Sequence, residues 1–159
     1  MTRLSYKLTA PGAYEAMLRL ERYVAQSGIE AALFELVKVR ASQLNGCAFC
    51  LDMHTKDARA AGESEQRLYL LPAWREAPCY SARERIALEW TEAVTVLGRD
   101  GVAQSLFEAA RAEFGDRDLV DLTMAVVAIN GWNRLAIAFR SPEAGSHMAT
   151  VRQPPTAAR

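Results

Sequence analysis

The chain has 159 residues, long enough for one domain with a substantial core, and its 19 lysines and arginines balance its 19 aspartates and glutamates. A neutral chain without a basic run lacks the electrostatic footprint of a nucleic-acid-binding or membrane-surface protein. Its start has no apolar stretch typical of a secretory signal, and no apolar run approaches the roughly 20 residues of a membrane span. We therefore predict a cytoplasmic protein, in a compartment where structural disulfides are rare.

The first half of the chain predicts four helices, because apolar residues recur with helical spacing between helix-type end signals. They are expected over residues 10–28, 29–46, 48–61 and 65–71. Pro11 marks the first start, and the pair Asn45-Gly46 is typical of a left-handed helix end. Ser64 can cap the fourth helix, which ends at a proline.

The second half predicts three more helices, and so an all-α fold of about seven helices. They are expected over residues 80–98, 102–115 and 118–139. Ser81, followed three residues later by Glu84, gives the first of them a capping-box start. Periodicity ends after the last helix, so we predict one domain over residues 1–140 and an irregular tail over residues 141–159.

Two of the three cysteines and one of the two histidines lie within the segment NGCAFCLDMH, residues 45–54. Cys47 is expected at a helix N-terminus, where unpaired N–H groups and the helix dipole favour a thiolate. His54 follows Cys50 by one helical turn on the same face, where a neutral imidazole can take the thiol proton. The spacing thus favours Cys47 as the more acidic thiol and Cys50 as the thiol beside a base, and leaves open which one attacks.

Glu35 is the nearest carboxylate on the preceding helix that could orient the histidine. It stands in the apolar run AALFELVKV. Burial there would favour its protonated form and suit it to relaying protons near neutral pH. The alternative is a solvated position on the flank of the helix.

Glu35, the pair Cys47-x-x-Cys50 and His54 together resemble the core motif of the alkylhydroperoxidase D family, within the carboxymuconolactone decarboxylase superfamily. The motif and its flanking helices cover residues 30–62, and similar segments extend the likeness to the end of the last predicted helix. The resemblance implies a single AhpD-like helical domain and a homo-oligomer, a trimer or a hexamer.

The resemblance implies a thiol-dependent peroxidase that reduces a small organic hydroperoxide and needs no cofactor or metal. Cys50 would attack the peroxide and become a sulfenic acid, which Cys47 would resolve as a disulfide. His54 and Glu35 would relay the protons. A dithiol reductant protein, of dihydrolipoyl type in the family, would then reduce the disulfide. Better-known members carry another histidine directly before the second cysteine, where this chain has Phe49.

Three other interpretations use the same cysteines. A non-enzymatic helical interaction module would bind zinc through the two cysteines and the histidine, with the glutamate as fourth ligand. Structural zinc sites of this spacing normally bring a second ligand pair, and only Cys79 and His147, in a loop and in the tail, remain. A redox sensor would use the dithiol to alter a partner contact, and two ordinary core cysteines would do neither.

Other polar and aromatic residues are expected to be structural. Cys79 has no predicted role. Trp90 and Trp132 are expected in the core or at a subunit contact rather than in a substrate pocket. Asn130 and Asn133, inside the most apolar helix, are expected to hydrogen-bond within the core or an interface, because unsatisfied buried amides are costly.

Overall fold

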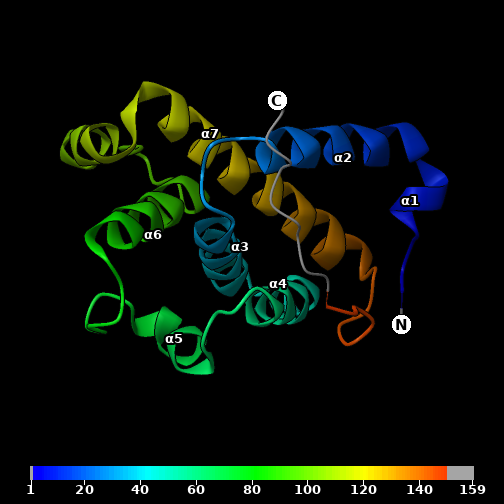
Figure 1. Cartoon of the computed structure of the whole chain (residues 1–159). Helices are drawn as coiled ribbons and strands as arrows, with labels where there is room; N and C mark the ends of the chain where they lie inside the picture. The colour runs from blue at the N-terminus through cyan, green and yellow to red at the C-terminus, as the bar shows by residue number, and fades with distance from the viewer. Residues whose placement is uncertain (1, 150–159) are drawn as a thin grey trace, which may run out of the picture.

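The computed structural model describes residues 2–149, and within them the chain forms seven α-helices, one short 3-10 helix and no strand (Figure 1). In chain order these are α1 (Tyr6–Thr9), α2 (Pro11–Ala25), α3 (Ala31–Asn45), α4 (Ala48–Ala60), α5 (Glu65–Leu70), the 3-10 helix η1 (Leu71–Ala73), α6 (Ala82–Thr95) and α7 (Gln104–Phe139). The predicted all-α fold class is confirmed.

Helix ends follow the predicted signals where the local chemistry dictates them. Gly46 adopts the left-handed conformation, with φ 67°, and ends α3 so abruptly that α4 begins two residues later. Ser81 and Glu84 form the full capping box, in which each side chain accepts a hydrogen bond from the other residue's backbone N–H. Ser64 accepts a hydrogen bond from the backbone of Arg67 at the start of α5.

Two features of the helix pattern differ from the prediction. The four-residue helix α1 was not predicted, since one turn is too short to show a period. The last two predicted helices run on as α7, which is kinked at Gly115. Gly115 has φ 73° and ψ 173°, so a glycine redirects the chain there without a separating loop.

Helix α3 lies at the centre of the fold and packs against α4, α6 and α7 (Figure 1). Residues 33–39 of α3 are all buried, so this helix has no solvent-facing side over its middle two turns. Each apolar side chain buried there stabilises the fold by about 1.5–3 kcal/mol. Because α3 is surrounded in this way, its polar residues Glu35 and Lys38 also lie inside the molecule.

Among the described residues, α7 is the one helix that is long and apolar enough to cross a membrane by length and composition alone. It is kinked, and it packs against α2, α3, α4 and α6. Its apolar composition therefore follows from its place in the core of the domain.

The described part of the predicted tail has no helix and lies against α4. The backbone N–H of Gly145 donates to Asp52 Oδ2 over 3.0 Å, and His147 Nε2 lies 2.8 Å from Asp57 Oδ1. The last ten residues of the predicted tail lie outside the described residues.

Candidate active site

The two motif cysteines lie where α3 ends and α4 begins. Cys47 is the N-cap residue of α4 and Cys50 lies in the first turn of that helix. Both are free thiols, and each is only 1% exposed. Their place at a helix start follows from Gly46, whose left-handed conformation turns the chain between the two helices.

Cys47 is the more acidic of the two thiols. Its pKa falls from an ordinary 9.0 to about 7, chiefly because the Cys50 thiol donates a hydrogen bond to its sulfur. Hydrogen bonds from the backbone of Cys50, the side chain of Asn133 and the backbone of Phe49 lower the pKa further and outweigh burial. This agrees with the acidity expected at a helix N-terminus.

Cys50 keeps its proton in the resting state. Its pKa is raised well above the ordinary value, because its thiol is hydrogen-bonded to Cys47 and because burial and the charge of Cys47 both penalise a second thiolate. Above about pH 7 the dithiol therefore carries one negative charge, mainly on Cys47, and one shared proton.

His54 and Glu35 form a buried pair between α4 and α3. His54 Nδ1 lies 2.8 Å from Glu35 Oε2, and the two residues are 5% and 6% exposed. The alternative of a solvated Glu35 on the helix flank is therefore wrong, because no side of α3 is solvated at this position. An ionised carboxylate can only accept, so Nδ1 then carries the proton and Nε2 is left as a base.

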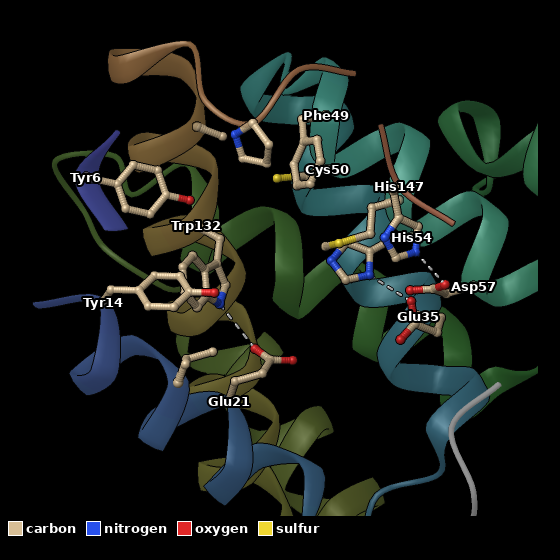
Figure 2. A pocket seen from close by; sticks show the side chains of 14 residues that line it. Tyr6, Tyr14, Glu21, Glu35, Phe49, Cys50, His54, Asp57, Trp132 and His147 are labelled. Atoms are coloured by element: carbon tan, nitrogen blue, oxygen red, sulfur yellow. Dashed lines mark hydrogen bonds and ion pairs between the residues drawn. The ribbon is translucent and has the colours of Figure 1, made fainter. Parts of the chain in front are cut away.

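A cavity of about 340 Å³ brings Cys50, His54 and Glu35 together (Figure 2). Aromatic side chains form much of its remaining wall, namely those of Tyr6, Tyr14, Phe49 and Trp132. The prediction that Trp132 serves only the core or a subunit contact is wrong, because α7 turns this ring toward the cavity. An apolar wall around one thiol suits an organic rather than an ionic substrate.

Cys47 does not line this cavity. It lines a second one, of about 270 Å³, together with Gly46, Ile137 and Arg140. Phe49, Ala136 and Pro142 line both cavities. The structure thus brings Cys50 together with the histidine and the glutamate, whereas Cys47, hydrogen-bonded to Cys50, lines the other cavity.

Several residues in the cavity wall or behind it had no signal in the sequence that marked them as part of the site. Lys38 lies behind Glu35, and Glu21 reaches the cavity from α2. The spacing of Glu35 and Lys38, i and i+3 on one helix, is a signal for an ion pair but not for burial. His147 also lines the cavity, beside His54 in Figure 2, and no pattern in the tail pointed to it.

No group of three or more His, Cys, Asp or Glu side chains among residues 2–149 is arranged to hold a metal ion. Cys79 is half-buried in its loop, where its carbonyl accepts a hydrogen bond from Arg67. The zinc interpretation needs four converging ligands. Its proposed ligands line two different cavities.

The two asparagines of α7 are hydrogen-bonded as expected. Asn45 donates to the side-chain oxygens of Asn130 and Asn133 over 2.6 and 2.8 Å, and Asn133 donates to Ser42. This cluster ties the end of α3 to α7 beside Cys47, and Trp90 lies in the core as predicted.

The sequence of this chain is similar to those of known proteins. A sequence model of the carboxymuconolactone decarboxylase family matches residues 11–93, just over half of the 159 residues. The chain is 45% identical over 136 residues to YdfG, an uncharacterised protein of Bacillus subtilis (strain 168), a match that covers 86% of this chain and 92% of YdfG.

Two crystal structures are similar over most of the chain. One is ATU0492 of Agrobacterium tumefaciens, a protein of unknown function proposed to be an antioxidant defence protein, AhpD. It superposes with a TM-score of 0.85 at 44% identity, over 96% of this chain and 100% of that one. The other is an uncharacterised peroxidase-related protein of Silicibacter sp. TM1040, with a TM-score of 0.71 and 25% identity over 79% and 67% of the two chains.

Proposed function

The chain belongs to the carboxymuconolactone decarboxylase family and has the helical fold of its AhpD-like members, and on this premise we propose that it is a thiol-dependent peroxidase. The reaction is the reduction of a small organic hydroperoxide to its alcohol by the Cys47–Cys50 dithiol. The observation that carries the proposal is one cavity that joins the Cys50 thiol, the His54–Glu35 pair and an apolar wall.

In the first step, which starts from the dithiol with both protons, His54 Nε2 takes the Cys50 proton while Cys47 keeps its own, and the Cys50 thiolate attacks the terminal peroxide oxygen. The O–O bond breaks, Cys50 becomes a sulfenic acid, and the alkoxide takes the proton from His54. The thiol and ROOH thus give the sulfenic acid and ROH, with atoms and electrons balanced. Glu35 accepts from Nδ1 throughout and stabilises the imidazolium that forms.

In the second step, the Cys47 thiolate attacks the Cys50 sulfur. The S–S bond forms, the S–O bond breaks, and hydroxide leaves as water after taking one proton. The backbone N–H groups of Phe49 and Cys50 at the helix start still stabilise the Cys47 thiolate after the Cys50 thiol has been oxidised. These assigned roles make Cys50 the peroxidatic and Cys47 the resolving cysteine.

The disulfide is then reduced by a dithiol protein, and we propose one of the dihydrolipoyl type. One of its thiolates attacks Cys50 and expels Cys47, which is the better leaving group because its thiolate is stabilised at the helix start. The second thiol of the reductant attacks the mixed disulfide and releases Cys50. The reductant leaves as its own disulfide, and both protein thiols are restored.

We further propose that the protein is a cytoplasmic homo-oligomer, a trimer or a hexamer, without a nucleic-acid or membrane partner. Support comes from α7, which packs in the core but also exposes apolar side chains that a neighbouring subunit would cover. They are Val120, Val127 and Ile137.

The proposal is tested by counting free thiols in reduced, chelator-treated protein before and after one equivalent of cumene hydroperoxide. The count is expected to fall from three to one, with peptide mapping of a Cys47–Cys50 bridge. Dihydrolipoamide should then restore three thiols. A count that stays at three contradicts the peroxidase assignment, and stoichiometric zinc in an untreated sample would then favour the metal-binding module. Slow oxidation that dihydrolipoamide does not reverse would instead favour the sensor.

A further inference from the structure

Lys38 is a lysine with no access to solvent. It is 1% exposed, and its ammonium group lies between two carboxylates. Lys38 Nζ is 2.5 Å from Glu21 Oε1 and 4.0 Å from Glu35 Oε1. Burying an ammonium group is costly unless it is paired, so a position of this kind is retained only where the charge is compensated.

The two carboxylates beside Lys38 both belong to the cavity of Cys50. Glu21 and Glu35 line it from α2 and α3, and Trp132 Nε1 donates to the second oxygen of Glu21 over 3.3 Å. Figure 2 shows Glu21 below Trp132 and Glu35 below His54. Lys38 therefore lies behind the cavity wall and connects its two acidic groups.

The protonation of Glu35 decides what His54 can do. A protonated carboxyl group donates to Nδ1, which moves the imidazole proton to Nε2 and leaves no base toward the cavity. An ionised carboxylate accepts from Nδ1 and leaves Nε2 bare. Burial alone favours the protonated form of Glu35, so His54 can act as a base toward the cavity only if a neighbouring charge holds Glu35 ionised.

We propose that Lys38 is a positioning residue that keeps Glu35 ionised and thereby fixes His54 in the tautomer that carries its proton on Nδ1. Its ammonium group lies 4.0 Å from Glu35 Oε1, and burial prevents water from screening its charge. Glu21 keeps the ammonium group in place and compensates its charge. The catalytic meaning of this arrangement rests on the proposed function, whereas the tautomer itself does not.

The other charged groups of the cavity form a separate pair. Asp57 and His147 face it from α4 and the tail and bind each other, with His147 Nε2 2.8 Å from Asp57 Oδ1. His147 is the only other histidine of the chain, so its NMR signals provide an internal reference for those of His54.

The test compares wild type, Lys38→Met, the double variant Lys38→Met/Glu21→Gln and Glu35→Gln. The double variant removes one buried charge of each sign, so it is expected to fold where Lys38→Met alone leaves Glu21 without its cation. Nitrogen NMR of the imidazole rings reports the tautomer of His54. The rate of Cys50 alkylation by iodoacetamide, measured by peptide mapping in a Cys47→Ser background, reports whether Nε2 still acts as a base.

In wild type we expect the proton of His54 on Nδ1. In the double variant we expect it on Nε2 and a Cys50 alkylation rate at least tenfold lower, close to that of Glu35→Gln, with His147 signals unchanged. A folded double variant that keeps both the wild-type tautomer and the wild-type rate overturns the proposal. A wild-type His54 that carries its proton on Nε2 also overturns the proposal. The wild-type spectrum gives this result even if the variants do not fold. Loss of peroxide turnover alone bears on the proposed function and leaves these two readouts intact.

Discussion

His54 and Glu35 lie 19 positions apart in the chain, yet Nδ1 of the first and Oε2 of the second are 2.8 Å apart in a buried pair. The contact exists because α3 and α4 pack against each other and Gly46 joins them with a single left-handed residue. A side chain in the middle of α3 thus meets one in the second turn of α4.

Removing either member of this pair should slow the reaction with cumene hydroperoxide. We expect His54→Ala to lower the single-turnover rate by about 100-fold, the typical lower value for a general base, and Glu35→Gln by roughly tenfold or more. The measurement is stopped-flow oxidation of the reduced protein. Glu76→Gln, an exposed glutamate in a loop, is the matched control and should react at the wild-type rate. Equal rates in all four proteins would refute the proton relay.

Substitutions of the two cysteines should stop the reaction at different steps. Cys50→Ser is expected to abolish peroxide consumption, because the remaining motif thiol lines the other cavity. Cys47→Ser should still consume one equivalent and then stop as a sulfenic acid, which dimedone traps and mass spectrometry locates. A Cys47→Ser protein that is inert, beside an active Cys50→Ser, would reverse the two assignments.

The dithiol should titrate near neutral pH. Because the pKa of Cys47 is about 7, its thiolate absorbance should reach half its maximum near that pH in the reduced protein. The largest cause is the hydrogen bond donated by Cys50, so Cys50→Ala should raise this midpoint toward 9.0. A midpoint that stays in place would show that the helix start alone sets the acidity.

The same shift predicts how stability depends on pH. Between about pH 7 and 9 the unfolded chain holds the Cys47 proton that the folded protein has lost, so the free energy of unfolding should rise with pH across this window. Below pH 7 the contribution is lost. Urea unfolding of wild type and Cys47→Ser at both ends of the window measures this contribution. An equal change in the free energy of unfolding with pH in the two proteins would contradict the prediction.

Gly46 should be intolerant of a side chain for reasons of backbone conformation. An added Cβ would meet no atom within 4 Å, so the cost is that of the left-handed conformation at φ 67°, about 1–2 kcal/mol. Gly46→Ala should lower the free energy of unfolding by that amount. Gly12→Ala, in a helix with equally open space, should leave stability unchanged or raise it. Equal losses in the free energy of unfolding for the two variants would show that the left-handed conformation of Gly46 is not the cause.

The sequence predicted the parts of the site that depend on local spacing. The pair Cys47 and Cys50, with His54 one turn on, follows from helical geometry, and Glu35 was selected as the nearest carboxylate on the preceding helix. Most helix ends were predicted because glycine, proline and capping serines act within a few residues.

The rest of the site depends on distant packing and could not be predicted. Tyr6 comes from a single-turn helix, and His147 from a segment without a pattern, whereas Trp132 was expected in the core or at a subunit contact. Lys38 had no predicted role, because periodicity cannot show that α3 is covered on every side. The kink at Gly115 joins two predicted helices, since a glycine can take up the turn that other residues would need a loop to make.

The separation of the two sulfurs into neighbouring cavities has a practical consequence. A reagent small enough to enter the cavity lined by Tyr14 meets Cys50, and one that enters the cavity lined by Arg140 meets Cys47. Each thiol is only 1% exposed, so the rate at which a small reagent labels it should depend on the cavity that it lines. The labelling rates of the two sulfurs would then report on two different surroundings that share Phe49, Ala136 and Pro142.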